Sequence, residues 1–290
     1  MLKYHITMDF CADYSRLVRY WMKKQGIQSD KNDWELWYEY FNYQKKSITP
    51  KKRNVRMSKE FICPQKHKKG LELLIQKFEK GEDVSKHLSK MARNPSCPDQ
   101  LLYDWGIYHF HLGENINSQT GYIERTGSLL FARIDEESVY LINIYEHGNW
   151  SKQEMVTILY SNWPDSIEPY RISEAWSIEE FTDEEYAAAR RAHEATLAKA
   201  DKNAVYGFLG GGYTSSGHSL QVVSFCDNIY NWFKELETDI KRELPRVIKY
   251  IEKLTGKPPS HNLHFMLWSE RDGIHIVELF SHAELTRLDF

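Results

Sequence analysis

The sequence, 290 residues long, has little of what marks several common protein classes. Its four cysteines, Cys11, Cys63, Cys97 and Cys226, are widely spaced and form no Cys-x-x-Cys pair, which argues against a zinc knuckle or a disulfide framework. No apolar run approaches the roughly 20 residues that a membrane helix needs. The N-terminal segment MLKYHITMDF lacks the order of basic, apolar and small residues found in signal peptides. We therefore expect a cytoplasmic protein without a membrane segment.

Motifs for nucleotide-binding loops are also absent. The segment GGGYTSSGHS, residues 210–219, places glycines before Ser and Thr, but it lacks the lysine of a Walker motif and does not match Gly-x-Gly-x-x-Gly. We interpret it as a flexible connector. No internal repeat or low-complexity tract is found, and we expect no cofactor. The hydrophobic content of 41% predicts a chain that can bury a large core.

Charge is nearly balanced, at -3, but it is distributed unevenly. Residues 45–69 contain ten Lys or Arg and one acid, Glu60, whereas residues 165–185 contain eight acids and one base, Arg171. Because a basic segment can neutralise phosphates and release their counterions, we predict an RNA-binding arm in the first of these segments. The alternative is a solvated basic loop. The predicted nucleic-acid-binding residues are Lys45, Lys46, Lys51, Lys52, Arg53, Arg56, Lys66, Lys68 and Lys69.

The periodicity of apolar residues predicts an α+β fold with an antiparallel sheet flanked by helices. Three segments between 105 and 147, GIYHFHL, GSLLFARI and SVYLINIYEH, alternate as strands do, and a tight turn at 135–137 joins the last two. The apolar stripe of LELLIQKFEKG predicts a helix that ends at Gly81. A C-terminal hairpin, LHFMLWSERDGIHIVELF, is predicted to turn at Asp272-Gly273.

Capping signals predict two further helices. Ser151 and Glu154 are spaced as a capping box before a helix that Pro164 stops, and Thr182 and Glu185 form a second box before EEYAAARRAHEATLAKA. A long amphipathic helix follows, which Pro245 is expected to kink or divide.

We therefore predict three regions. Residues 1–100 form a mostly helical region with the basic arm, and residues 101–165 form the sheet and helix that carry the site. Residues 166–290 form a helical region whose terminal hairpin packs on that core.

Histidines on the first predicted strand are the candidate catalytic groups. Since side chains two apart on a strand share a face, His109 and His111 point away from Tyr108 and Phe110. If the three strands place their polar side chains on one side of the sheet, an acid/base cluster results, with Arg125 or Trp150 at its rim. The alternative is the half-solvated face of an ordinary antiparallel sheet. The predicted catalytic residues are His109, His111, Arg125, Arg133, Tyr145 and His147.

These residue types suit RNA cleavage. Histidine titrates near neutrality and arginine holds phosphate by two parallel bonds, so His, Arg and Tyr can supply a base, a cation and an acid without a metal. A competing interpretation is a metal-dependent hydrolase, in which His109 and His111 bind one ion and His147 with Asp104 or Glu146 completes the site. The primary prediction contains no metal ligand.

The order of a basic helical segment, the strands GIYHFHLG, RTGSLLFARID and VYLINIYEH, and a following helix resembles the core of the RelE/HigB/ParE toxin superfamily over residues 70–150. This resemblance implies a metal-independent endoribonuclease of the toxin or phage-defence type, with an antitoxin as a possible partner. It implies that Arg125 or Arg133 holds phosphate. It also implies acid/base roles for His109, His111, Tyr145 or His147. The alternative class is a non-catalytic protein that binds nucleic acid or another protein.

Overall fold

The computed structural model describes residues 4–172 and 181–288, so part of the acidic segment 165–185 lies outside the described residues. The chain is α+β and forms two compact units. Residues Phe41–Val222 form one, here called the central unit, and Met1–Tyr40 with Val223–Phe290 form the other, the terminal unit. The chain therefore divides near residues 40 and 222, whereas the sequence suggested boundaries at 100 and 165, because the two chain ends share one sheet.

The terminal unit contains a sheet of order β1-β8-β9-β10. Its strands are β1 (His5–Thr7), β8 (Asn262–Glu270), β9 (Gly273–Glu278) and β10 (Ala283–Leu288). The predicted hairpin is confirmed, since Glu270 pairs with Gly273 across the turn. The hairpin extends to β10 and pairs in parallel with β1 through β8. The hairpin is therefore part of the terminal unit's own sheet, whereas the sequence predicted that it packs on the 101–165 core.

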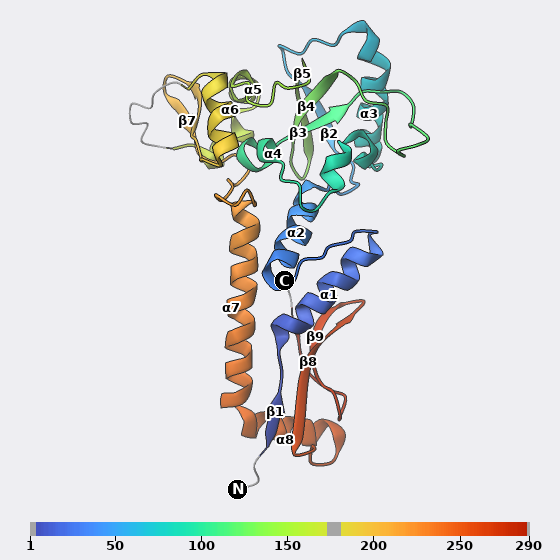
Figure 1. Cartoon of the computed structure of the whole chain (residues 1–290), viewed down its shortest axis with the longest axis vertical. Coiled ribbons are helices and arrows are strands. Elements are labelled where there is room, and N and C mark those ends of the chain that lie inside the picture. The colour runs from blue at the N-terminus through green and yellow to red at the C-terminus, as the bar shows by residue number, and fades with distance from the viewer. Residues whose placement is uncertain (1–3, 173–180, 289–290) are drawn as a thin grey trace. The chain divides into compact units, whose positions relative to one another are not determined.

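Helices cover this sheet. The helix α1 (Phe10–Lys24) lies along β8 (Figure 1). The chain divides at Pro245 as predicted, since α7 (Leu220–Arg242) ends before it and α8 (Leu244–Thr255) has it in the first turn. The helices α2 (Asp33–Lys46) and α7 each have residues in both units.

The central unit is built on a sheet of order β2-β5-β4-β3. Its strands are β2 (Asn54–Met57), β3 (Ile107–His111), β4 (Ser128–Ile134) and β5 (Ser138–Glu146). The three predicted antiparallel strands and the turn at 135–137 are confirmed. The fourth strand, β2, lies inside the basic segment and pairs in parallel with β5. Residues 54–57 of that segment are therefore an edge strand of the sheet, and its ends belong to α2 and α3, so the segment is not a separate arm.

Two layers of helices enclose this sheet. On one face, Phe110 and Leu130 pack against Leu74 and Phe78 of α3 (Lys68–Lys80). The helix α3 ends at Gly81 with φ +74°, as the sequence predicted. On the other face lie α4 (Gln100–Trp105), α5 (Glu154–Asn162) and α6 (Asp183–Ala192).

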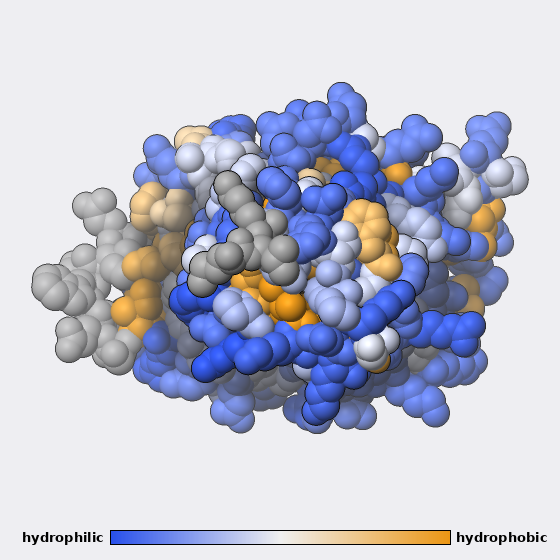
Figure 2. Space-filling model, turned by 90° about the horizontal axis from the view of Figure 1, so that it is seen from below, coloured by the Kyte–Doolittle hydropathy of each residue, from blue (hydrophilic) through white to orange (hydrophobic). Residues whose placement is uncertain are grey.

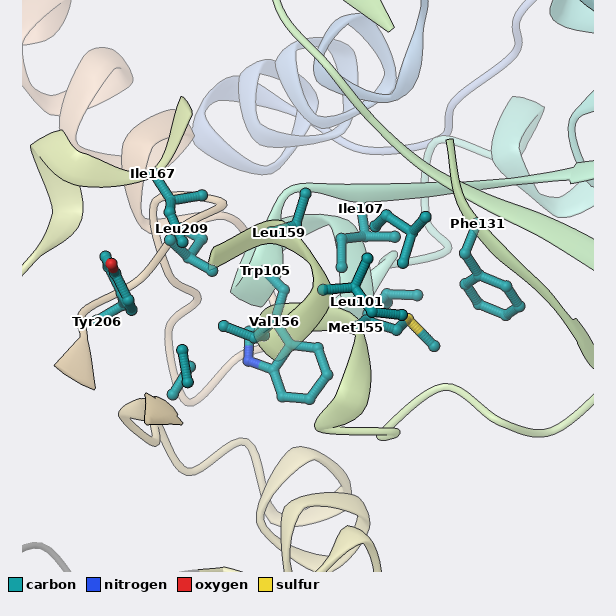
Figure 3. Packing of buried hydrophobic residues seen from close by; sticks show 14 of the residues in the cluster. Leu101, Trp105, Ile107, Phe131, Met155, Val156, Leu159, Ile167, Tyr206 and Leu209 are labelled. Atoms are coloured by element: carbon teal, nitrogen blue, oxygen red, sulfur yellow. The ribbon is translucent and has the colours of Figure 1, made fainter. Parts of the chain in front are cut away.

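The core on this second face is apolar and closely packed. Met155 and Leu159 of α5 lie beside Trp105 of α4 and Ile107 of β3 (Figure 3). Trp105 is 1% exposed and Ile107 is fully buried, so these contacts hold α4 and α5 firmly on the sheet. The remaining short elements of this unit are η1 (Gln65–His67), η2 (Ser85–His87), η3 (Lys90–Arg93), η4 (Pro164–Ser166), η5 (Glu168–Tyr170), β6 (Ala198–Asp201) and β7 (Ala204–Tyr206).

The two predicted capping boxes have different outcomes. Thr182 and Glu185 form both bonds of a capping box at the start of α6. The box predicted for Ser151 and Glu154 is wrong, because Gln153 is the N-cap of α5 and makes no side-chain cap bond. The hydroxyl of Ser151 instead accepts a hydrogen bond from an arginine of α6. The helix α6 is also shorter than predicted, because residues 198–201 form β6.

The glycine-rich segment 210–219 packs against α4. The amides of Gly210 and Gly212 donate to the carbonyls of Asp104 and Tyr103, at 2.7 and 2.8 Å. A Cβ on Gly210 would lie 2.0 Å from the carbonyl oxygen of Leu102, so only glycine permits this approach. The interpretation as a free connector is therefore wrong.

None of the helices in residues 4–172 and 181–288 combines the length and apolarity needed to span a bilayer. The face of the molecule drawn in Figure 2 is mostly hydrophilic, and hydrophobic residues occupy small separate areas on it.

Candidate functional site

The short helix α4 places a carboxylate beside the first histidine. Asp99 is the N-cap of α4, and its Oδ1 accepts a hydrogen bond from the amide of Leu102 at 3.1 Å. The helix ends after six residues at Gly106, whose φ of +68° turns the chain back into β3. This reversal brings Oδ2 of Asp99 to 4.0 Å from Nδ1 of His109.

The rings of two predicted catalytic histidines contact the same tryptophan, Trp150. The ring of Trp150 lies 4.7 Å from that of His109 and 5.1 Å from that of His147, measured between centroids. His109 belongs to β3 and His147 follows the end of β5, so strands at different positions in the sheet bring them together. The ring of Phe131 in β4 lies 5.6 Å from that of Trp150, also measured between centroids. The structure thus places His109 and His147 on the same side of the sheet.

A cavity of about 790 Å³ opens beside this cluster, within the central unit. Its walls come from the start of α4, the segment 148–152, α6 and η3. Its charged and aromatic lining includes Asp99, His109, Trp150, Lys152 and Arg191. The cavity is large enough for a small organic ligand or one nucleotide.

Burial sets the protonation state of His109. It lowers the pKa of this imidazole, and the charge of His147 lowers it further, while the carboxylate of Asp99 acts in the opposite direction. His109 is therefore neutral at neutral pH and able to accept a proton. His147 is exposed to solvent.

A buried ion pair holds the segment that carries Trp150. Nε and Nη2 of Arg190 each lie 2.9 Å from Oδ2 of Asp104, and the two side chains are 4% and 1% exposed. Nη1 of Arg190 donates to the carbonyl of Trp150 and, at 3.2 Å, to the hydroxyl of Ser151. Its guanidinium also lies 4.0 Å from the ring centre of Trp105. Arg190 therefore ties α6, α4 and the Trp150 segment together.

His111 lies outside the cavity lining. It is buried, and its Nδ1 accepts a hydrogen bond from the amide of Thr126 at 3.3 Å. Burial, with a smaller contribution from Arg125, lowers its pKa to about 4. The imidazole is therefore neutral and held by the backbone. Arg125 is exposed and does not line the cavity.

Arg133 and Tyr145 are engaged by other groups. The buried guanidinium of Arg133 donates to the carbonyls of Trp105 and Leu209, at 3.3 and 3.2 Å, so it braces the fold and is not directed at the cavity. The hydroxyl of Tyr145 donates to Glu154 at 2.9 Å. Burial first, and then this bond, raise the pKa of Tyr145, which makes it a poor proton donor. The sequence-based prediction that all six residues converge is thus met only by His109 and His147.

The first two lysines of the basic segment are anchored in the fold. Nζ of Lys45 donates a hydrogen bond to Oε1 of Gln221 at 2.5 Å, and burial lowers the pKa of Lys45 to about 8. Lys46 is 2% exposed and donates to the carbonyls of Asn94 and Cys97. Neither lysine extends from a mobile arm, because both lie in the last turn of α2, within the central unit.

The remaining basic residues are spread over a surface. Lys51 pairs with Glu136 at 2.7 Å and Lys69 with Glu114 at 2.5 Å, so part of their charge is neutralised. Arg53 donates to the carbonyls of Asp135 and Thr49. Lys52, Arg56, Lys66 and Lys68 are also exposed. Lys52 precedes β2 and Arg56 lies in it, whereas Lys66 lies in η1 and Lys68 begins α3.

The metal interpretation lacks a ligand set. Within residues 4–172 and 181–288, no three His, Cys, Asp or Glu side chains are grouped as a metal site. Asp104, one of the ligands considered, is paired with Arg190, and Nδ1 of His111 accepts from the backbone.

Asp99, Lys152 and Arg191 are among the cavity residues that were not predicted from the sequence. An Asp before a short helical pattern is a recognisable N-cap, so Asp99 could have been placed at the start of a helix. Its approach to His109 depends on the reversal at Gly106, which no local pattern specifies.

Comparison of the chain with protein family models, with curated proteins and with solved structures found no match. The resemblance of residues 70–150 to the toxin superfamily therefore stays a prediction, and the site is interpreted from its own chemistry.

Proposed function

We propose that the protein is a metal-independent endoribonuclease whose active site is the cavity beside His109. The observation that carries the proposal is the approach of His109 to Asp99 at 4.0 Å in a cavity of about 790 Å³, which both residues line. His147 does not line the cavity, but its ring lies 5.1 Å from that of Trp150, which does. A neutral imidazole next to a carboxylate is suited to accept a proton, and a second imidazole nearby can donate one.

In the proposed reaction, His109 removes the proton of an RNA 2′-hydroxyl. The 2′-oxygen attacks the adjacent phosphorus, the bond from phosphorus to the 5′-oxygen breaks, and His147 gives a proton to that leaving oxygen. The products are a 2′,3′-cyclic phosphate and a free 5′-hydroxyl. Lys152 and Arg191 line the cavity and stabilise the negative charge on the phosphate oxygens, although Lys152 also pairs with Glu154 at 3.1 Å.

The cleavage test uses purified protein and RNA in the presence of EDTA. Wild-type protein should cut, and His109→Ala and His147→Ala should each lower kcat/KM by about 10²- to 10⁴-fold, the usual contribution of a general acid or base. His261→Ala, at an exposed position of the terminal unit, is the matched control and should cut normally. Cleavage that chelation abolishes, or a folded His109→Ala variant that still cuts, would contradict the proposal.

A second function is favoured by the exposed cations Lys52, Arg56, Lys66 and Lys68. They suit binding of an RNA backbone without cleavage, which depends on salt because counterions are released. RNA that is bound and left intact in the assay above would support this non-catalytic function. If the chain does cut RNA in its host cytoplasm, an inhibitory partner of the antitoxin kind is expected.

A further inference from the structure

We infer that the cavity binds a single unstacked nucleotide, with its base against Trp150 and one phosphate at His109. This inference rests on the proposed function in taking RNA as the natural source of that nucleotide. It concerns binding, however, and free mononucleotides can test it without any cleavage.

The size of the cavity suits one nucleotide. Its volume of about 790 Å³ lies within the range of roughly 300 to 1,000 Å³ that is typical of small-molecule sites. A base stacked and paired inside a duplex cannot enter such a space, because it would first have to leave its neighbours. The ligand is therefore expected to be a free nucleotide or an unpaired base of a single strand.

Part of the cavity lining is apolar and suits contact with a planar base. Met91, Ala92, Pro98, Leu101 and Ala187 all line the cavity, and none of them carries a polar side-chain group. Trp150 adds an aromatic surface that is only half-buried. Stacking on aromatic side chains is the usual way in which proteins hold an unpaired base, since every base has a π-face.

The polar lining favours one phosphate over several. His109, Lys152 and Arg191 can approach a phosphate group. Asp99, beside His109, and Asp183 and Glu184, at the start of α6, also line the cavity and would repel additional negative charge. The carbonyl of Trp150 is bound by Arg190, so the aromatic surface is held in place before a ligand enters.

The test measures binding by calorimetry with the wild-type protein and four probes: a nucleoside monophosphate, the matching triphosphate, ribose 5-phosphate and inorganic phosphate. The monophosphate should bind at least tenfold more tightly than the other three. Trp150→Ala should weaken this binding by about 10-fold or more, as expected for loss of base stacking, and Trp150→Phe should weaken it much less. Trp268→Ala is the control, because Trp268 is an exposed tryptophan of β8 in the terminal unit.

A second variant tests the site without replacing Trp150, so that its result does not depend on whether Trp150→Ala folds. Ala187→Phe should fill the cavity from α6 without removing a contact of the tryptophan, and it should abolish binding. Equal affinity for ribose 5-phosphate and the nucleotide, or unchanged binding by Trp150→Ala, would overturn the inference. Nucleotide binding without RNA cleavage would refute the proposed enzyme and support the nucleotide site. RNA cleavage without nucleotide binding would support the proposed enzyme and refute the nucleotide site.

Discussion

At the residue scale, the environment of each histidine decides its role. His109 faces a carboxylate and a cavity, whereas His111, two residues further along the same strand, is held by a backbone amide. Both pKa values are lowered chiefly by burial. Only the first has room for a substrate, so the two imidazoles of one sequence motif are expected to act as a base and as a structural group.

The pairing of Asp99 with His109 predicts a shift in the pH dependence of cleavage. The carboxylate favours the protonated imidazole, so Asp99→Asn should lower the pKa of His109 still further. Since the neutral imidazole is the active base, the acidic limb of the kcat/KM profile should move to lower pH in this variant. A limb that stays in place or moves to higher pH would show that His109 is not the titrating base.

The buried state of His111 predicts how the folding stability of the protein depends on pH. The pKa of His111 is about 4 in the folded protein and about 6.5 when unfolded, so the unfolded chain binds the extra proton between these values. Stability should therefore fall as pH drops from 6.5 to 4, by about 3 kcal/mol from this group. His111→Gln should remove this part of the loss in urea unfolding measured across that range. A variant with the same pH dependence as wild type would contradict the neutral, buried state of His111.

At the element scale, α4, α6 and the Trp150 segment depend on one buried ion pair. Arg190→Met would leave Asp104 buried without its partner, which typically costs about 3 to 5 kcal/mol. The double variant Asp104→Leu with Arg190→Met should be more stable than Arg190→Met alone, because no charge is then left unpaired. Urea unfolding measures both. A cost below about 1 kcal/mol for Arg190→Met would mean that the pair behaves as a surface salt bridge does.

Elements that depend on local patterns were predicted well. A period of two in the strand segments, with turn residues between them, identified β3, β4 and β5, and the apolar stripe with Gly81 identified α3. The strand β2 was missed because its four residues, NVRM, lie in a charged segment and are fixed by parallel pairing with a distant strand. Alternation also gave the face of each predicted strand on which His109 and His147 lie, but it left open whether strand pairing brings these faces together. It could not show that Arg133 would be used by backbone carbonyls, since these come from α4 and from Leu209.

At the scale of the whole molecule, the central unit is a continuous stretch between the two parts of the terminal unit. The terminal unit forms because His5 pairs with Asn262 and Thr7 with His264, contacts that span almost the whole sequence. No local pattern reports such a pairing, which is why the sequence suggested three consecutive regions. Every residue that lines the proposed active site belongs to the central unit.

The most direct test of the central claim is the fate of a single 2′-hydroxyl. An RNA oligonucleotide is cut by the wild-type protein in EDTA, the cleaved bond is located, and a second oligonucleotide is made with one 2′-deoxy sugar on the 5′ side of that bond. The account predicts that the first RNA yields a 2′,3′-cyclic phosphate and that the second stays intact at that position. Cleavage of the deoxy-substituted bond, or a product with a 5′-phosphate, would contradict it.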